Sequence, residues 1–300
     1  MFKLIRPNSN YNFIAKRKPA IILSMFLVLV SISSFFMQGL NWGIDFSSGY
    51  VVQLKFDNQI SISEIRKTFE SNDISDAVIQ SFGSNKEVLI KLKEDSNFNK
   101  ESINNFLINS FSDDKPFKII KLEFVGSQIG DELREKGEWA MLVALLSILV
   151  YIGFRFEFIY GIGAIIALIH DVIITLGFFS IFQIEFNLSV LSAALAVIGY
   201  SLNDTIVVYD RIRENTRIVK TDHYDNLLNN SVNQTLSRTV ITSLTTMFVL
   251  ISLYLLGGAA VELFALAMMI GILVGTYSSI FIASTSLLLL GANAEIRENN

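Results

Sequence analysis

The chain contains six long apolar runs, and a polar stretch separates the first run from the other five. A helix needs about 20 mostly apolar residues to cross the hydrocarbon core of a bilayer. The pattern predicts a polytopic α-helical membrane protein with six transmembrane helices. The expected spans cover residues 20–40, 138–156, 160–181, 187–209, 232–256 and 261–290, with residues 1–19 and 291–300 as terminal segments.

The polar stretch, residues 41–137, has the short alternating patterns of a separate α+β domain. Ser61 followed by Glu64 predicts a capping box at the start of a helix that runs to Phe69. The predicted order is strand, helix, strand, strand, helix, strand, which is typical of a ferredoxin-like fold. The expected strands are 51–56, 77–81, 88–92 and 117–125, and the second helix is 98–111.

Composition narrows the possible functions. Hydrophobic residues make up 51% of the 300 residues and charged residues 17%, which excludes an ordinary soluble domain. The net charge of −4 gives no case for a nucleic-acid partner. Cysteine is absent, so a disulfide framework, thiolate chemistry and a Cys-ligated zinc site are excluded. The sequence has no Walker-type phosphate loop, so any use of ATP would reside in a partner.

Lysine and arginine distribution sets the expected topology. Basic residues precede the first span, Arg155 lies at the end of the second, and four more follow the fourth, namely Arg211, Arg213, Arg217 and Lys220. The turns at 182–186 and 257–262 contain no Lys or Arg. The positive-inside bias therefore predicts cytoplasmic termini and an external α+β domain. The first run lacks a signal-peptide cleavage pattern, so we expect an uncleaved helix.

Polar and charged groups interrupt three of the spans. His170 and Asp171 lie near the middle of the third, Asp204 follows Asn203 in the fourth, and Arg238 begins the fifth. A charge at the centre of a bilayer costs about 2.5–3.5 kcal/mol on an insertion scale and is normally functional and paired. We expect Asp204 and Arg238 to meet in the cytoplasmic third of the bundle.

The fifth span carries threonines on the same helical face as Arg238. Thr242, Thr245 and Thr246 follow it at helical spacing, and this face is predicted to look into the bundle. An aspartate beside an arginine can be protonated from one side of the membrane and deprotonated to the other. A membrane potential contributes about 2.3 kcal/mol per charge per 100 mV to such a cycle.

Simpler interpretations exist for each charge. Asp204 can lie just past the membrane edge, Arg238 can be a snorkelling interfacial arginine, and Asp171 can be a static polar group between helices. Charged groups on three different spans favour the proton relay. Gly271 and Gly275 form a G-x-x-x-G spacing in the sixth span that favours close approach of a neighbouring helix.

Several motifs occur in the same order as in a known protein family. They are GIDFSSG at 43–49, HDV at 170–172, GYSLNDTIVVYDRIREN at 199–215 and TLSRTVITS at 235–243. The chain resembles the SecF family, the smaller membrane subunits of the bacterial SecD–SecF export pair, which are similar to split resistance–nodulation–division transporters. The family motif after the first span falls on Gly43, Asp45, Phe46 and Gly49, with Ser48 where a glycine is common.

The resemblance implies six spans, one periplasmic domain and no enzymatic activity. It implies a proton-coupling pair at Asp204 and Arg238, with Asp171 and His170 in a further family motif and Asn203 and Thr242 as supporting polar residues. The implied coupling ion is the proton, with no other cofactor and no metal. The implied partners are a SecD-like subunit, the SecYEG channel, the SecA motor, the translocating unfolded polypeptide and the lipid of the bacterial inner membrane.

Three other functions are considered. The first is half of another proton-driven exporter of the resistance–nodulation–division type, which would have the same relay. The second is an intramembrane aspartyl protease that uses Asp171 and Asp204, which the sequence S-L-N-D at 201–204 argues against. The third is a static scaffold, which predicts that Asp204→Asn is harmless.

Overall fold

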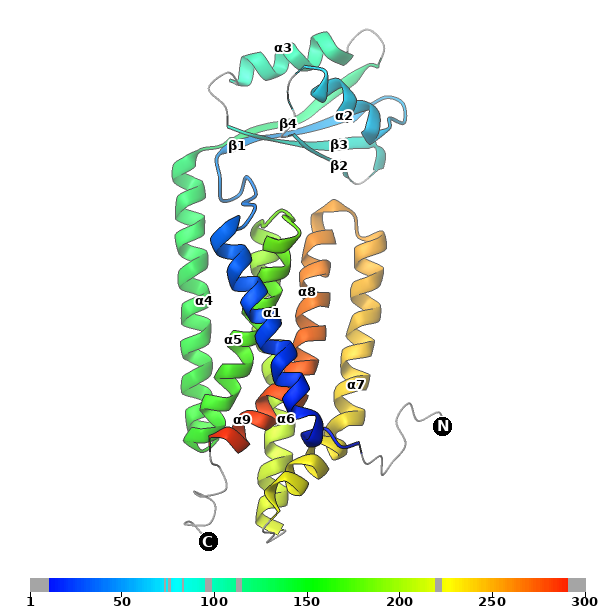
Figure 1. Cartoon of the computed structure of the whole chain (residues 1–300). Helices are drawn as coiled ribbons and strands as arrows, with labels where there is room; N and C mark the ends of the chain where they lie inside the picture. Colours follow the sequence, from blue (N-terminus) through cyan, green and yellow to red (C-terminus); the bar gives the residue numbers. More distant parts are fainter. Residues whose placement is uncertain are drawn as a thin grey trace.

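The computed structural model describes residues 11–72, 74, 77–82, 84–94, 99–111, 115–218 and 223–290. A small α+β domain stands on one end of a helical bundle, and its sheet lies between the bundle and two helices of the domain, α2 (Ile62–Glu70) and α3 (Lys100–Phe111) (Figure 1). The first helix of the bundle begins, and the last one ends, at the opposite end of the bundle (Figure 1). Among the described residues, six helical segments are long and apolar enough to cross a membrane, as predicted.

The α+β domain has the predicted ferredoxin-like topology. Its antiparallel sheet has the order β2-β3-β1-β4. Alternate residues of the central strand are buried, and Val52 lies opposite Ile90 on one side and Leu122 on the other. The elements are β1 (Gly49–Phe56), α2 (Ile62–Glu70), β2 (Val78–Phe82), β3 (Ser84–Lys93), α3 (Lys100–Phe111) and β4 (Phe117–Val125).

The predicted capping box at α2 is wrong. The Ser61 side chain caps no backbone N–H group and instead lies 2.6 Å from the Ser63 hydroxyl. The Glu64 carboxylate, which would have completed the box, forms an ion pair with Lys115. A charged partner offers a carboxylate a stronger hydrogen bond than a backbone amide does, so Glu64 turns away from the helix end.

Each helix of the membrane bundle extends past its predicted span at one end, although α1 (Arg17–Met37) ends before the predicted end at residue 40. The bundle helices are α1, preceded by a 3-10 turn (Ile14–Lys16), α4 (Ser127–Arg155), α5 (Phe158–Ile181), α6 (Leu188–Ile218), α7 (Tyr224–Leu256) and α8 (Ala259–Ser278). The predicted second span begins at residue 138, whereas α4 is continuous from Ser127 and rises directly out of the sheet domain (Figure 1). Hydropathy marks only the part of a helix that suits lipid, so it misses polar helical ends.

The sixth apolar run is divided into three segments. After α8, residues Ser279–Ala283 form a π-helical turn, and α9 (Ser284–Leu289) completes the run. π-helical turns are rare in proteins, and those that occur are often found at functional sites. Here it directly follows Tyr277 and Ser278, which belong to the polar cluster described below.

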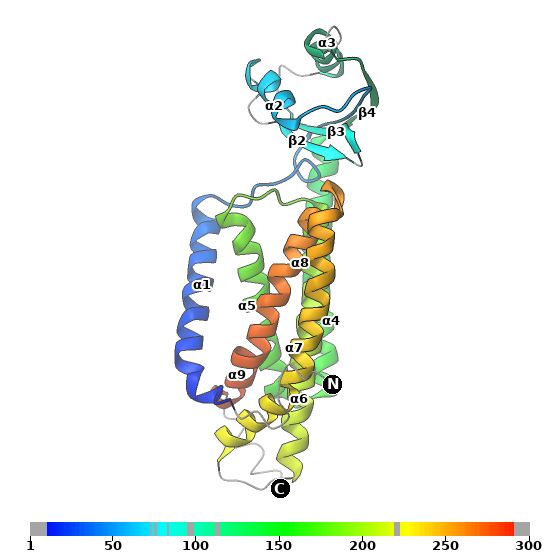
Figure 2. The ribbon, with the colours of Figure 1, turned by 90° about the vertical axis from the view of Figure 1, so that its right-hand side faces the viewer.

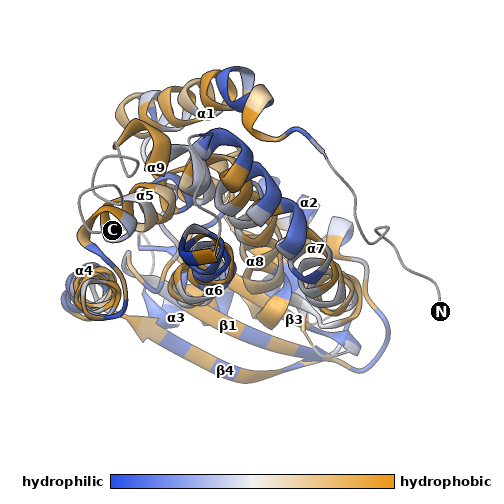
Figure 3. Ribbon diagram, turned by 90° about the horizontal axis from the view of Figure 1, so that it is seen from below, coloured by the Kyte–Doolittle hydropathy of each residue, from blue (hydrophilic) through white to orange (hydrophobic). Residues whose placement is uncertain are grey.

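The six helices are not equally buried. In the most apolar stretch of each span, more than half of the residues of α5, α6 and α8 are buried, whereas fewer than one in five of those of α1, α4 and α7 are buried. Seen along the bundle axis, α4 lies on one side of α6, α8 and then α7 lie on the other, and α5 lies toward α1 (Figure 3). In the perpendicular view, α1 stands at the edge of the bundle beside α5 (Figure 2). The buried polar groups therefore converge where α5, α6 and α8 meet.

Candidate functional site

Close packing between α6 and α8 positions the site. A Cβ atom added at Gly275 would lie 2.9 Å from the Cβ of Ser201, and one added at Gly271 would overlap Val197. The predicted close approach at the G-x-x-x-G spacing is confirmed, because two glycines one helical turn apart receive two α6 residues at the same spacing. Ser201 is thereby brought next to the residues that follow Gly275.

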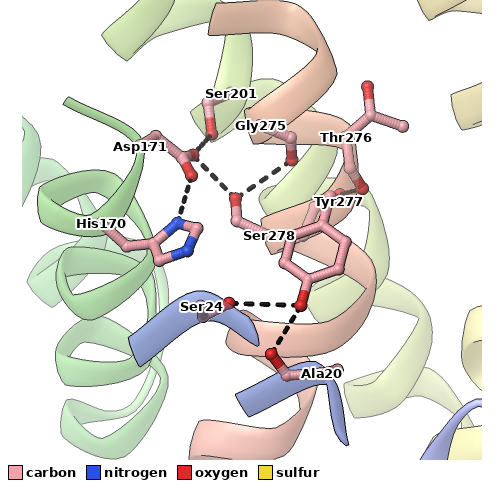
Figure 4. Close-up of polar contacts among 10 residues, drawn as sticks. Ala20, Ser24, His170, Asp171, Ser201, Gly275, Thr276, Tyr277 and Ser278 are labelled. Atoms are coloured by element: carbon pink, nitrogen blue, oxygen red, sulfur yellow. Dashed lines mark hydrogen bonds and ion pairs between the residues drawn. The ribbon is translucent and has the colours of Figure 1, made fainter. Parts of the chain in front are cut away.

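The Asp171 carboxylate is the centre of a buried polar cluster (Figure 4). Ser201 of α6 donates to Asp171 Oδ2 at 2.5 Å, and Ser278 of α8 donates to the same oxygen at 2.7 Å. His170 Nδ1 lies 2.9 Å from Asp171 Oδ1. Only 1% of Asp171 is exposed, so these three groups supply the polar contacts that water would otherwise supply.

Tyr277 extends this cluster to α1. Its ring stacks on His170 with centroids 6.3 Å apart, and its hydroxyl donates to the Ala20 carbonyl at 2.7 Å. Ser24 donates to the same hydroxyl at 3.2 Å (Figure 4). On the other side of α8, the Thr276 hydroxyl lies 2.7 Å from that of Ser243 on α7. The cluster therefore joins α1, α5, α6 and α8, and Thr276 ties α7 to the same helix.

Asp204 lies three residues after Ser201, on the same buried face of α6. It is 3% exposed, and its Oδ2 atom has no hydrogen-bond partner among the described residues. The Arg238 guanidinium attracts this carboxylate electrostatically. In the part of the chain that the structure describes, however, no hydrogen bond or ion pair joins the two side chains. Asp204 is thus a buried carboxylate next to an arginine that it does not touch.

The predicted inward orientation of the Arg238 face is wrong for the single chain. Arg238 and Thr245 are exposed, and Thr242 and Thr246 are half-buried. The α7 helix packs on α6 and α8, so this face borders the open side of the bundle. Tyr200 of α6 reaches it and donates to the Thr242 carbonyl at 3.1 Å. Asn203, adjacent to Asp204 in sequence, is also exposed.

The motif at 43–49 lies between the two domains and fixes the turn that leads into α6. Gly43 N–H donates to the Phe186 carbonyl at 2.9 Å, and Phe46 stacks on the Phe186 ring. Asp45 Oδ2 accepts a hydrogen bond from the backbone N–H of Leu188 at 3.0 Å. A Cβ atom on Gly43 would lie 2.7 Å from the Glu185 carboxylate, so a larger residue here would have to displace that side chain.

The sheet also takes part in the connection between the two domains. A Cβ atom on Gly49 would overlap the Leu92 carbonyl of β3, so β1 requires glycine where it begins. Lys91 of β3 forms a largely buried ion pair with Glu185 at 2.6 Å. Among the described non-glycine residues, only Gln183 has a positive φ, so Ser48 needs no glycine conformation.

The sequence prediction missed several residues of the site. Ser201, Tyr277 and Ser278 are as important to the Asp171 cluster as His170 is, yet serine and tyrosine are common in apolar runs. Lys91 and Glu185 are far apart in sequence and meet only through the fold. Asp171 and Asp204 share no hydrogen bond among the described contacts, and Asp171 is fully engaged by His170 and two serines. This arrangement differs from a pair of carboxylates that share a proton.

The fold and the buried polar groups define a polytopic membrane protein with intramembrane charges and one extramembrane α+β domain. The family model described as "Protein export membrane protein SecD/SecF, C-terminal" matches residues 107–293, and the "SecD/SecF GG Motif" model matches residues 33–60. The chain belongs to the SecF family of protein translocase subunits.

Similar curated proteins cover the chain almost completely. The chain is 42% identical over 297 residues to "Protein translocase subunit SecF" of Vibrio alginolyticus, covering 98% of this chain and 94% of the relative. It is 47% identical to the SecF of Magnetococcus marinus, covering 94% and 92%. The solved SecDF of Thermus thermophilus, described as a translocon-associated membrane protein, is 36% identical with a TM-score of 0.80. The match covers 95% of this chain and 40% of that longer chain.

Proposed function

We propose that this chain works with a SecD-like subunit in the bacterial inner membrane and uses the proton-motive force to complete the export of unfolded polypeptides. The observation that carries the proposal is Arg238, a full charge on the exposed face of a membrane helix, beside the unpartnered carboxylate of Asp204. A lone charge facing lipid costs about 2.5–3.5 kcal/mol, so this face needs a protein cover.

The face around Arg238 suits a second helical subunit. The exposed stripe of α6 consists of small residues, Ser192, Ala196, Gly199 and Asn203. A Cβ atom on Gly199 would meet no described atom within 4 Å. Small residues in a membrane helix let a neighbouring helix approach closely. The α6 helix that carries the stripe has α4 on one side and α7 on the other (Figure 3), and fewer than one in five residues in the apolar stretches of α4 and α7 are buried, so a partner helix can pack against this face.

The two states of Asp204 supply a mechanism. When Asp204 is ionised, the attraction of Arg238 draws α6 and α7 together into an ion pair. When Asp204 binds a proton, it loses its charge, and Arg238 is released toward other partners. Protons that enter from one side and leave to the other then drive a cycle of helix movements. The contacts of Asp45 and Lys91 connect α6 and its preceding turn to the external domain.

The remaining assignments follow from this role. The coupling ion is the proton, the chain itself carries out no enzymatic reaction, and ATP is used by a separate motor such as SecA. The basic ends of the spans lie in the cytoplasm, and the α+β domain lies in the periplasm, where it meets polypeptide that leaves the SecYEG channel.

Export in a strain that lacks the native copy tests the proposal. Asp204→Asn keeps the size of the side chain and removes the titrating proton, so late-stage release of a secreted protein should become independent of the proton-motive force and fall to the level of the deletion strain. Asp210→Asn is the matched control, because Asp210 lies on the same helix and forms an exposed ion pair with Arg155, which contributes little. Full export with Asp204→Asn would refute the proton-driven mechanism.

A further inference from the structure

A groove with a volume of about 440 Å³ lies on the outer side of the bundle, between α1, α5 and α9. Its lining is almost wholly apolar. The principal lining residues are Ile21, Met25 and Leu29 of α1, Ile166 and Ile169 of α5, and Leu289 of α9. Hydrocarbon suits such a groove better than water does, because a bound water needs two to four polar partners.

The groove together with Lys18, which lies beyond its end, has about the length of one leaflet of a bilayer. Along α1, the face that lines it runs from Ile21 to Leu29 and is continued by Lys18, which precedes Ile21 by three residues and shares its face. Lys18 and Leu29 are separated by about 16 Å along the helix axis. Half of a hydrocarbon core that is about 30 Å thick is close to this length.

The cytoplasmic mouth of the groove carries a free positive charge. Lys18 is exposed and forms no ion pair among the described residues, whereas its neighbour Arg17 is already paired with Asp225 at 2.6 Å. Lysines at this level of a membrane protein attract the headgroups of anionic lipids of the cytoplasmic leaflet. The mouth is thus complementary to a phosphate headgroup, as the walls are to an acyl chain.

The inner end of the groove reaches the polar cluster. His170 and Thr285 both line it, and both are more than nine-tenths buried. Their His170 Nε2 and Thr285 Oγ1 atoms have no hydrogen-bond partner among the described residues. Material that fills the groove therefore packs against the histidine that contacts Asp171 and against Thr285.

We propose that the groove is a binding site for an anionic phospholipid of the cytoplasmic leaflet. Its headgroup phosphate lies at Lys18, and one acyl chain lies along α1 and covers His170 and Thr285. This site is separate from the proton-coupling role proposed above for Asp204 and Arg238. Its consequence is that a bound acyl chain covers the side of the Asp171 cluster that faces lipid.

Native mass spectrometry of the purified full chain, titrated with phosphatidylglycerol or phosphatidylcholine of the same acyl composition, tests the site. The chain should retain one phosphatidylglycerol and bind it about fivefold more tightly than phosphatidylcholine, as expected for one lysine at a membrane surface. Met25→Trp fills the groove from an exposed position and should weaken retention of both lipids at least tenfold. Leu23→Trp adds the same bulk on another exposed face of α1 and should leave retention unchanged.

A second pair of variants tests the mouth without filling the groove. Lys18→Gln should abolish the preference for phosphatidylglycerol, whereas Lys16→Gln, which alters an exposed lysine outside the groove face, should preserve it. Equal behaviour of Met25→Trp and Leu23→Trp, or no retained lipid in the unmodified chain, would overturn the proposal. Lipid binding that begins only after removal of residues 291–300 would assign the groove to the chain's own terminus and would also overturn it.

Discussion

The side chain of Asp45 accepts a hydrogen bond at 3.0 Å from the backbone N–H of Leu188, the first residue of α6. Asn187 accepts a second one from the Val190 N–H at 3.1 Å. Both satisfy N–H groups that have no partner inside the helix, and the negative charge of Asp45 suits the positive end of the helix dipole. Because α6 carries Asp204, this contact connects the external domain to the proposed proton site.

Replacing Asp45 tests this connection. Asp45→Ala should destabilise the purified chain by about 1 kcal/mol, the usual cost of losing a helix cap, and should lower export in cells. Asp45→Asn keeps an acceptor and loses only the charge, so its effect should be smaller. Thermal unfolding in detergent measures the difference. Asp57→Ala, in an exposed turn of the α+β domain, is the control, and an identical unfolding temperature for the two alanine variants would remove Asp45 from this role.

The Asp45 motif also illustrates the limits of the sequence. Its residues are identified by resemblance, but the turn that they hold lies more than 130 residues later, and no local pattern predicts that contact.

The six spans and the strand order were predictable because apolar length and alternation are local properties. Helical spacing also shows correctly that Arg238 and Thr242 lie near one another on α7. It does not show which face the neighbouring helices cover, so the inward orientation was wrong.

The proposed coupling of Asp204 and Arg238 predicts non-additive effects. Arg238→Met keeps the length of the side chain and removes its charge, and it should abolish proton-dependent export as Asp204→Asn does. The double variant should be no worse than either single one, because residues that act as a unit do not contribute separately. Arg238→Lys should be only partly active, since lysine lacks the planar guanidinium. Effects that add would show that the two residues act independently.

The Asp171 cluster predicts a stability effect. Ser201→Ala and Ser278→Ala each remove a hydrogen bond to a buried carboxylate, so each should destabilise the chain by about 1.5–3 kcal/mol. Ser192→Ala is the control, because Ser192 is exposed and, among the residues that the structure describes, bonds only to the Leu188 carbonyl of its own helix. Thermal unfolding of the three purified variants measures the effect. A Ser278→Ala variant as stable as Ser192→Ala would show that Asp171 does not depend on this contact.

The proposed orientation predicts the behaviour of reporter fusions. A reporter fused after Lys93, in β3, should behave as periplasmic, and one fused after Arg217, near the end of α6, should behave as cytoplasmic. The physical reason is the excess of Lys and Arg at the ends of the spans opposite the sheet domain. Alkaline phosphatase, active only in the periplasm, and a fluorescent protein that matures in the cytoplasm make a complementary pair. The reverse pattern at either position would invert the proposed topology.

Substitutions at two glycines distinguish helix packing within this chain from packing against the proposed partner subunit. A Cβ atom on Gly275 would meet Ser201, so Gly275→Leu should force α6 and α8 apart and lower the stability of the isolated chain by about 1–3 kcal/mol, as overpacking does. Gly199 faces open space, so Gly199→Leu should leave the isolated chain as stable or stabilise it by up to about 1 kcal/mol through better helix propensity.

The same Gly199→Leu variant should, however, fail to copurify with the SecD-like subunit at full yield, because the added side chain projects from the exposed α6 face on which the partner is proposed to pack. Gly153→Leu is the control, since this α4 glycine also faces open space in the described structure but lies outside the α6 stripe. Copurification from cells that co-express both subunits, together with thermal unfolding of each isolated variant, distinguishes the two effects. A Gly199→Leu chain that is stable and binds its partner normally would place the subunit interface on another face of the bundle.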